Sequence, residues 1–233
     1  MSEPLSSSNN SSNLSDKEDE EQAEESSSEG GWIEWYCSLE GNEYLLEIPE
    51  DYIKDMSNLY GLKSKVTNFS ESLFHILSGG IPDEEDLQNE NYLELYQSCT
   101  DLYGLIHARY IQTPLGLTIM RERYLAGKFG VCSRVLCEKH NVIPIGMSNE
   151  IRTSRVKVFC PRCQEVYYPK DKNGELDGAF FGSSFPHVLL QTFPYMYPLL
   201  PHNQYVPKIA GFKVHNGRGI YSDKIETKYR VDI

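Results

Sequence analysis

Residues 132–137 read CSRVLC and residues 160–163 read CPRC, and the four cysteines in these two stretches decide the fold. They form a C-x4-C pair and a C-x2-C pair with 22 residues between them. Two such pairs at this separation are typical of a zinc ribbon, in which thiolates from two hairpins meet on one tetrahedral ion. Four protein sulfurs leave no open position for water or substrate. The sequence therefore predicts one structural Zn²⁺ ion, bound by Cys132, Cys137, Cys160 and Cys163.

Two disulfides are the alternative use of these four cysteines. Disulfide scaffolds are usually small secreted domains, and residues 1–10 contain neither the basic region nor the apolar run of a secretory signal. No stretch approaches 18 apolar residues, so we expect no membrane span. A reducing compartment and a bound metal therefore fit better. We expect His140 to be a surface residue rather than a ligand, and Cys37 and Cys99 to be buried free thiols.

The charge of the chain argues against one common role of zinc ribbons. The 233 residues carry a net charge of −12, of which residues 1–31 contribute −8 and the rest −4. Phosphate backbones are bound by basic surfaces, so an acidic chain is a poor partner for nucleic acid. A negative charge suits binding to basic proteins or polyamines instead. A nucleic-acid-binding or transcription factor is therefore only the alternative function of this cysteine pattern.

Residues 1–31 are rich in Ser, Glu and Asn and contain almost no large apolar side chain. Such a segment cannot bury enough surface to offset the entropy lost on ordering, so we expect a disordered acidic tail. Ser15 and Ser26 each have a glutamate three residues downstream, which makes both candidate sites for an acid-directed kinase. Phosphate at either serine would add negative charge to a segment that already repels itself.

Residues 32–127 have the apolar spacing of an α-helical domain that begins at the aromatic segment 32–36. Large side chains recur every three or four residues, and glycine or proline marks several boundaries. The aromatic residues after position 90 are more typical of a packed core than of a cofactor site. We expect helices over Asp51–Leu59, Ser64–Leu77, Glu90–Gln112 and Pro114–Leu125.

From residue 128 onward prolines and glycines become frequent, and the expected strands are short. Arg155–Phe159 and Glu165–Tyr168 flank the second cysteine pair, which predicts a hairpin with the cysteines at its turn. After Asp177 the chain is rich in aromatics and prolines, and we expect extended segments that pack along the helical domain. The expected fold class is α+β, with an N-terminal α-helical domain, a four-cysteine zinc ribbon and an extended C-terminal segment.

Seven short motifs are spread along residues 103–215. They are YGLIHARYI (103–111), FGVC (129–132), IPIG (143–146), CPRC (160–163), DGAFFG (177–182), FPH (185–187) and GFKVH (211–215). In order and spacing they resemble the regulatory beta subunit family of casein kinase II, over about residues 32–215. The resemblance implies a non-catalytic subunit that dimerises through its zinc ribbon. Such a dimer carries two catalytic kinase subunits in a heterotetramer, stabilises them and alters substrate selection.

The resemblance also implies roles for particular residues. The four cysteines would be the zinc ligands, and Val135 and Val166 beside them would lie in the dimer contact. The acidic run resembles a family loop that attracts polyamines and basic protein substrates, although acids at the first turn of a helix need no further role. This run consists of Asp83, Glu84, Glu85 and Asp86.

Residues 208–215 resemble the arm with which family members dock on the kinase. The family inserts aromatic side chains from a short hairpin into an apolar site. The docking residues implied here are Ile209, Phe212 and Val214, and Ala210 stands where a second aromatic is common. The alternative is that these apolar side chains pack on their own domain.

These patterns divide the chain into five segments. No pattern supplies a nucleophile or a pocket, so we expect no catalytic residue, and we expect His107 and Arg109 to be packed, hydrogen-bonded side chains. We expect a protein of cytoplasm and nucleus. Its acidic charge predicts no binding to nucleic acid, and the lack of a long apolar stretch predicts no membrane association. The segments are a disordered acidic tail (1–31), an α-helical domain (32–127), a zinc-ribbon dimerisation domain (128–178), an extended segment with the docking arm (179–215) and a flexible C-terminal tail (216–233).

Overall fold

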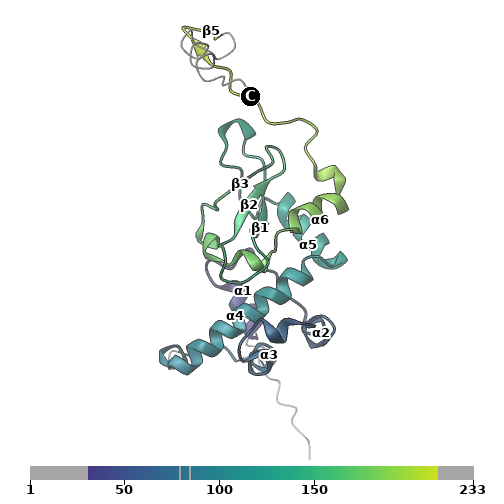
Figure 1. The fold of residues 1–233 in the computed structure, drawn as a ribbon, viewed down its shortest axis with the longest axis vertical. Coiled ribbons are helices and arrows are strands. Elements are labelled where there is room, and N and C mark those ends of the chain that lie inside the picture. The colour runs from purple at the N-terminus through teal and green to yellow at the C-terminus, as the bar shows by residue number, and fades with distance from the viewer. Residues whose placement is uncertain (1–30, 79, 84, 215–233) are drawn as a thin grey trace, which may run out of the picture.

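The computed structural model describes residues 31–78, 80–83 and 85–214 of the chain. Most of the helices gather at one end, a sheet lies beyond them, and the chain continues after α6 in an arm that ends in a small hairpin (Figure 1). The α-helices are α1 (Trp32–Ser38), α2 (Glu50–Lys54), α3 (Phe69–Ser78), α4 (Glu90–Tyr110), α5 (Pro114–Leu125) and α6 (Phe185–Thr192). The strands are β1 (Ile143–Ile145), β2 (Lys157–Cys160), β3 (Glu165–Tyr167), β4 (Lys208–Ile209) and β5 (Phe212–Lys213). Short 3-10 helices are η1 (Leu62–Ser64), η2 (Asp86–Gln88), η3 (Val135–Cys137), η4 (Lys172–Glu175), η5 (Gly178–Phe180) and η6 (Pro194–Met196).

Helix α4 runs through the centre of the helical layer. Its first turn is capped by the Asn89 side chain, and from Ser98 onward most of its side chains are buried. The rings of Trp32 and Tyr36 in α1 stack with centroids 4.8 Å apart, and both meet Tyr103 of α4 edge-on. The expected use of these aromatics as core residues is confirmed.

Three of the expected helices are shorter than the sequence predicts. Helix α4 lacks only its last two residues, since it ends at Tyr110 instead of Gln112. Helix α2 ends at Lys54 instead of Leu59, because turns occupy the residues that follow. Helix α3 begins at Phe69 instead of Ser64. Asn68, immediately before it, has a φ of 53°, and a left-handed residue cannot continue an α-helix. Helix α5 has the expected bounds, with the Thr113 side chain as its N-cap.

Strands β1, β2 and β3 form an antiparallel sheet in sequence order. Phe159 of β2 lies opposite Ile143 of β1 on one side and Val166 of β3 on the other. Cys160 is paired with Glu165, so the residues between them close a tight turn at the end of the sheet. The predicted hairpin around the second cysteine pair is confirmed, whereas β1 was not expected.

The helical layer and the sheet share one hydrophobic core. Gly104 of α4 lies against the Phe180 ring, and a Cβ at this glycine would fall 2.1 Å from the ring. The fully buried His107 hydrogen-bonds through Nδ1 to the Phe180 carbonyl at 2.7 Å, and burial lowers the pKa of this histidine to about 4. Arg109 donates to two backbone carbonyls of the turn after α2. Both side chains are packed and hydrogen-bonded, as expected.

Residues 185–192 form helix α6, so the prediction of extended chain is wrong for this stretch. Pro186 lies in the first turn, where its missing N–H breaks no helical hydrogen bond. Phe185 and Leu189 are four residues apart and both fully buried, which fixes one face of the helix on the core. Residues 201–207, by contrast, have no regular secondary structure.

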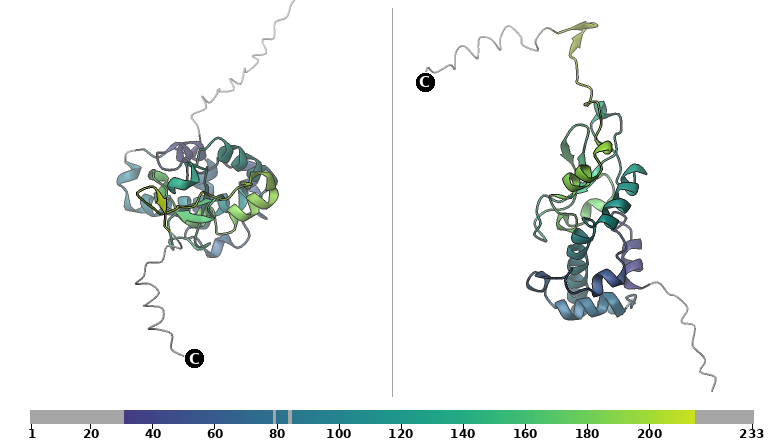
Figure 2. Two further views of the ribbon diagram at one scale, coloured as in Figure 1. Left: turned by 90° about the horizontal axis from the view of Figure 1, so that it is seen from above. Right: turned by 90° about the vertical axis from the view of Figure 1, so that its right-hand side faces the viewer.

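The hairpin of β4 and β5 stands away from the rest of the molecule (Figure 2). Its turn consists of Ala210 and Gly211, with φ values of 48° and 85°. Two positive φ values in a two-residue turn are typical of type I′ hairpins, whose twist matches that of the strands. Among the described helices, none is both long enough and apolar enough to cross a membrane.

Candidate metal centre and partner surfaces

The four cysteines predicted as metal ligands lie together. All four Sγ atoms are within 4.8 Å of one another, and every one of these side chains is buried. The Sγ atoms of Cys132 and Cys163 are 3.8 Å apart. A tetrahedral ion with metal–sulfur bonds of about 2.3 Å keeps its ligands about 3.8 Å apart, so this spacing fits zinc. The cysteines of the described region form no disulfide, and these four could hold a metal ion.

Each cysteine pair is shaped by a tight turn. In the first turn the backbone N–H of Arg134 donates to the Cys132 sulfur at 3.4 Å, and Glu138 has a φ of 55°. In the second turn the N–H of Gln164 donates to the Cys160 carbonyl at 2.8 Å, and Gln164 has a φ of 59°. Left-handed residues reverse the chain sharply, and this reversal brings the two sulfurs of each pair to the same side.

Arg162 links the two turns. Its Nη1 donates to the Cys137 carbonyl and to the Glu138 carboxylate, both at 3.0 Å. Burial raises the pKa of the Cys137 thiol to about 12 and raises that of Cys160 well above its ordinary value. Buried thiols this close together cannot all ionise unless a cation offsets their charge, and a divalent metal does so.

His140 is half-buried rather than at the surface, and its Nε2 lies 3.3 Å from the Tyr124 hydroxyl. Burial lowers the pKa of this imidazole. The four sulfurs gather without it. The remaining cysteines of the described region are free: Cys99 is fully buried, and Cys37 is half-buried with its sulfur 3.4 Å from the Tyr103 hydroxyl.

The two valines predicted for the dimer contact lie in different environments. Val135 is in η3, between two of the cysteines, and is 89% exposed. Val166 is in β3, is half-buried and packs against the core. The turn between Cys132 and Cys137 therefore presents an apolar side chain to solvent, whereas Val166 has only part of its surface free for a partner.

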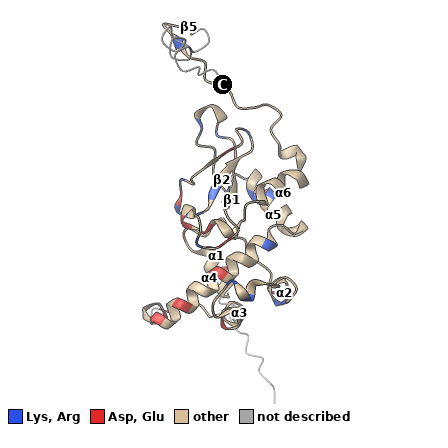
Figure 3. Cartoon of the chain, viewed as in Figure 1, with Lys and Arg blue, Asp and Glu red and all other residues tan. Residues whose placement is uncertain are grey.

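Three acids of the predicted acidic loop are described, and Glu84 lies outside the described residues. Asp83 and Glu85 are exposed, and the acids of this region lie next to the start of α4 (Figure 3). The Asp86 N–H donates to Asp83 Oδ1 at 2.8 Å, and the Asp83 N–H donates back to Asp86 Oδ2 at 3.2 Å. Burial and then the Asp86 carboxylate raise the pKa of Tyr92 to about 12. Asp83 and Asp86 therefore stabilise the turn between them through these hydrogen bonds, in addition to carrying charge.

The side chains predicted for kinase docking are mostly free of the rest of the chain. Ile209 is 73% exposed and Phe212 is 80% exposed, while Val214 is half-buried. The alternative, in which these side chains pack on their own domain, does not describe Ile209 or Phe212. His215, the last residue of the predicted arm, lies outside the described residues, as do the predicted phosphorylation sites Ser15 and Ser26 and the tail after residue 215.

Comparisons with known proteins agree with the sequence motifs. A family model described as "Casein kinase II regulatory subunit" matches residues 31–213. The chain is 46% identical over 189 residues to "Casein kinase II subunit beta" of Dictyostelium discoideum, which covers 80% of this chain and 69% of that protein. It is 45% identical over 187 residues to the Schizosaccharomyces pombe protein of the same name, covering 79% of each. It is 41% identical over 192 residues to "Casein kinase II subunit beta'" of Drosophila melanogaster, covering 81% of this chain and 86% of that protein. These matches do not favour the nucleic-acid-binding alternative.

Proposed function

Because the chain belongs to the casein kinase II regulatory subunit family and is a non-catalytic subunit, we propose that it scaffolds the kinase through a zinc-dependent dimer. The four buried cysteines hold one structural zinc ion per chain, and the ribbon built on them pairs with a second copy. The dimer carries two catalytic subunits in a heterotetramer, stabilises them and modulates substrate selection. The family match over residues 31–213 carries this proposal, and the spacing of the four sulfurs supports the choice of metal.

Binding to a casein kinase II catalytic subunit tests the proposal. The zinc-loaded full chain is mixed with that subunit and analysed by size-exclusion chromatography with light scattering. We expect the two chains in equal amounts, in a complex with the mass of a heterotetramer. Prior treatment with a zinc chelator should lower the mass and weaken the complex. Salt-sensitive retention on DNA, with no binding to the kinase subunit, would contradict the proposal.

The ribbon face is the proposed dimer contact. Its support is Val135, which stays exposed although the turn that carries it is held by two buried cysteines. Single exposed apolar side chains are common on protein surfaces, so Val135 supports this contact only together with the family match over residues 31–213. Val166 contributes the part of its side chain that the core leaves free.

We predict that Val135→Asp makes the dimer monomeric. A carboxylate at the centre of an apolar contact has no partner for its charge, which weakens association by about 3 kcal/mol or more, roughly a hundredfold in dissociation constant. Analytical ultracentrifugation over a concentration series measures this shift. Met56→Asp, at a 61% exposed position after α2, is the matched control and should leave the dimer intact. Dimerisation of Val135→Asp at the wild-type concentration would remove Val135 from the interface.

The acidic loop is the proposed site for polyamines and basic partners, with Asp83, Glu84, Glu85 and Asp86 as its charges. We predict that replacing all four by their amides removes polyamine stimulation of the reconstituted kinase and leaves the fold unchanged. Asparagine oxygens can still accept the two backbone hydrogen bonds of this turn, so only the charge is lost. Kinase activity is measured against polyamine concentration at low salt, because at 0.1 M salt exposed charges farther apart than about 10 Å are largely screened from one another.

The control is the same activity measurement on a chain with Glu47→Gln and Asp51→Asn, which replace two exposed acids outside the loop. That chain should respond to polyamine like the wild type. Full stimulation of the four-amide chain would show that the loop is only a solvated start of the next helix.

The remaining sequence-based assignments form part of the same proposal. The arm 208–215 docks on the kinase through Ile209, Phe212 and Val214, supported by the exposure of the first two. The chain acts in cytoplasm and nucleus, and Ser15 and Ser26 are its phosphorylation sites. The organisation is an acidic tail (1–31), a helical domain (32–127), a ribbon (128–178), a segment with the arm (179–215) and a C-terminal tail (216–233).

A further inference from the structure

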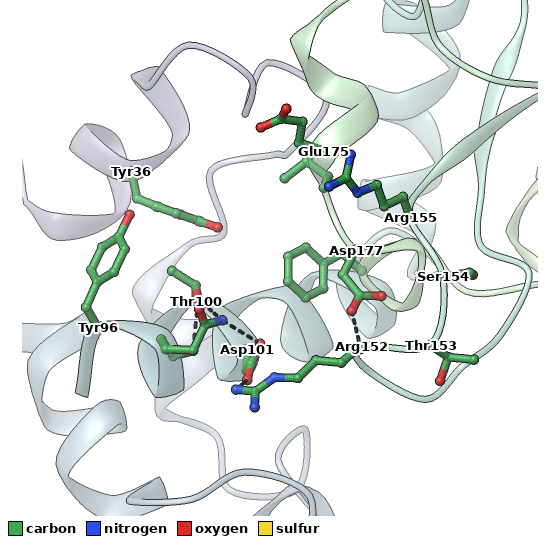
Figure 4. Close-up of a pocket in the computed structure, with 13 residues that line it drawn as sticks. Tyr36, Tyr96, Thr100, Asp101, Arg152, Thr153, Ser154, Arg155, Glu175 and Asp177 are labelled. Atoms are coloured by element: carbon green, nitrogen blue, oxygen red, sulfur yellow. Dashed lines mark hydrogen bonds and ion pairs between the residues drawn. The ribbon is translucent and has the colours of Figure 1, made fainter. Parts of the chain in front are cut away.

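A pocket of about 450 Å³ lies between the helical layer and the loop that leads into β2. Its walls come from segments far apart in the sequence: α1 and α4 on one side, residues 152–155 on another, and residues 175–180 on a third (Figure 4). A pocket of this size can hold one or two amino-acid side chains. It lies outside the metal centre, the acidic loop and the arm.

The floor of the pocket contains a buried carboxylate. Asp101, in the middle of α4, is 4% exposed. Its Oδ1 accepts a hydrogen bond from the Gln97 amide at 3.2 Å, and its Oδ2 accepts one from Arg152 Nη2 at 2.6 Å. Removing a carboxylate from water is costly unless a cation pairs with it. Arg152 supplies that cation.

Among the described residues, Asp101 is the one hydrogen-bond partner of the Arg152 guanidinium, while the Arg152 backbone N–H donates to the Asp177 carboxylate. The Arg152 side chain is 62% exposed and reaches the pocket from a surface loop. Arg152 has a φ of 58°, in the left-handed region that a side-chain-bearing residue adopts at a cost. Its guanidinium lies beside Asp101 (Figure 4). The Arg152 guanidinium thus occupies the position beside Asp101 in which a cation from another molecule would bind.

The other walls suit a planar cation. The rings of Tyr36 and Tyr96 line one side with centroids 6.5 Å apart, and Phe180 lies between α4 and the loop. Among the described residues, the Glu175 carboxylate makes no ion pair and the buried Ser154 hydroxyl has no hydrogen-bond partner. Guanidinium groups stack on aromatic faces and donate to two acceptors at once, which a compact ammonium does less well.

We propose that this pocket binds the guanidinium of an arginine side chain in a basic partner peptide, which displaces Arg152 from Asp101. The pocket contains three carboxylates, from Asp101, Glu175 and Asp177, against the guanidiniums of Arg152 and Arg155. When Arg152 leaves, this balance favours an incoming cation still more. Displacement also frees the loop at Arg152 from its ion pair with α4, so binding loosens one link between the helical layer and the sheet.

The test measures binding of N-acetyl-arginine methylamide to the zinc-loaded full chain by NMR titration at fixed low salt. Wild type should bind it weakly, because Arg152 competes for the same carboxylate. Arg152→Gln should bind it at least tenfold more tightly, since the competing charge is gone while a hydrogen-bond donor remains for Asp101. Asp101→Asn should bind it at least tenfold more weakly than wild type. N-acetyl-lysine methylamide should bind more weakly than the arginine compound to all three.

Lys65→Ala is the matched control. It breaks another ion pair between the helical layer and the same loop, Lys65 Nζ to Glu150 Oε1 at 3.0 Å, without touching the pocket, and it should bind the probe like wild type. A peptide with one arginine between small residues should bind more tightly than the amino-acid derivative; equal affinity would overturn the choice of a peptide as the natural ligand.

Two outcomes would overturn the site as a whole. One is equal affinity of wild type and Arg152→Gln for the arginine derivative. The other is no binding to wild type at a hundred times the dissociation constant of Arg152→Gln, which would make Arg152 a purely structural partner of Asp101. Circular dichroism and zinc content of each variant verify that the comparison is made between folded chains.

Discussion

Cys160→Ser is expected to give a chain that binds no stoichiometric zinc and no longer pairs with a second copy. Cys160 is fully buried, ends β2 and lies in the cluster of four sulfurs. Structural zinc binding contributes about 10–16 kcal/mol of apparent free energy, which equals or exceeds the total stability of about 5–15 kcal/mol of most domains. Because both turns converge on this one cluster of sulfurs, losing the metal should unfold the ribbon and its interface together.

The measurements are zinc content and sedimentation of the purified variant, with Cys37→Ser as the matched control. Cys37 is also a free cysteine, half-buried and outside the cluster, so its replacement should leave zinc and dimer unchanged. An intact, zinc-free dimer of Cys160→Ser would refute the coupling between metal and pairing. A zinc-loaded dimer of Cys160→Ser would show that the other three cysteines are sufficient to bind the metal and to maintain the dimer.

The metal centre could be predicted from the sequence because its determinants are local. A C-x2-C pair at the turn of a hairpin places both sulfurs on one side, and the β2–β3 pairing around Cys160 follows from the residues on either side of it. The long helices were predictable for the same reason, since the spacing of aromatics along α4 is visible in the sequence. Local patterns of this kind predict the final structure well when the tertiary contacts favour the same secondary structure.

The features that the sequence did not reveal depend on contacts between distant segments. The pairing of Asp101 with Arg152 joins residues 51 positions apart, and nothing near either residue indicates the other. Helix α6 was missed because the prolines and aromatics of the segment around it are also typical of extended chain, and only burial of Phe185 and Leu189 decides for a helix. The start of α3 depends on one left-handed residue, Asn68, which sequence periodicity cannot detect.

Phe212→Ala is expected to weaken binding to the kinase catalytic subunit by about 2 kcal/mol or more, roughly 30-fold in dissociation constant. Phe212 is 80% exposed at the start of β5, on a hairpin that stands away from the body, so truncating it removes contact area without opening a cavity in the core. Calorimetry or surface plasmon resonance with the catalytic subunit measures the loss. Phe74→Ala, at a 72% exposed aromatic of α3, is the control and should bind like wild type.

A substitution in the turn of the same hairpin should strengthen binding to the catalytic subunit instead of weakening it. Ala210 carries no aromatic ring, and it is exposed in a turn that Ile209 and Phe212 flank. Ala210→Tyr should therefore add a second aromatic contact and tighten binding, since paired aromatic anchors on a rigid hairpin bury more area for little loss of side-chain entropy. If Phe212→Ala and Ala210→Tyr both bind the catalytic subunit with wild-type affinity, the hairpin is not the docking arm. The kinase must then contact another surface of the chain.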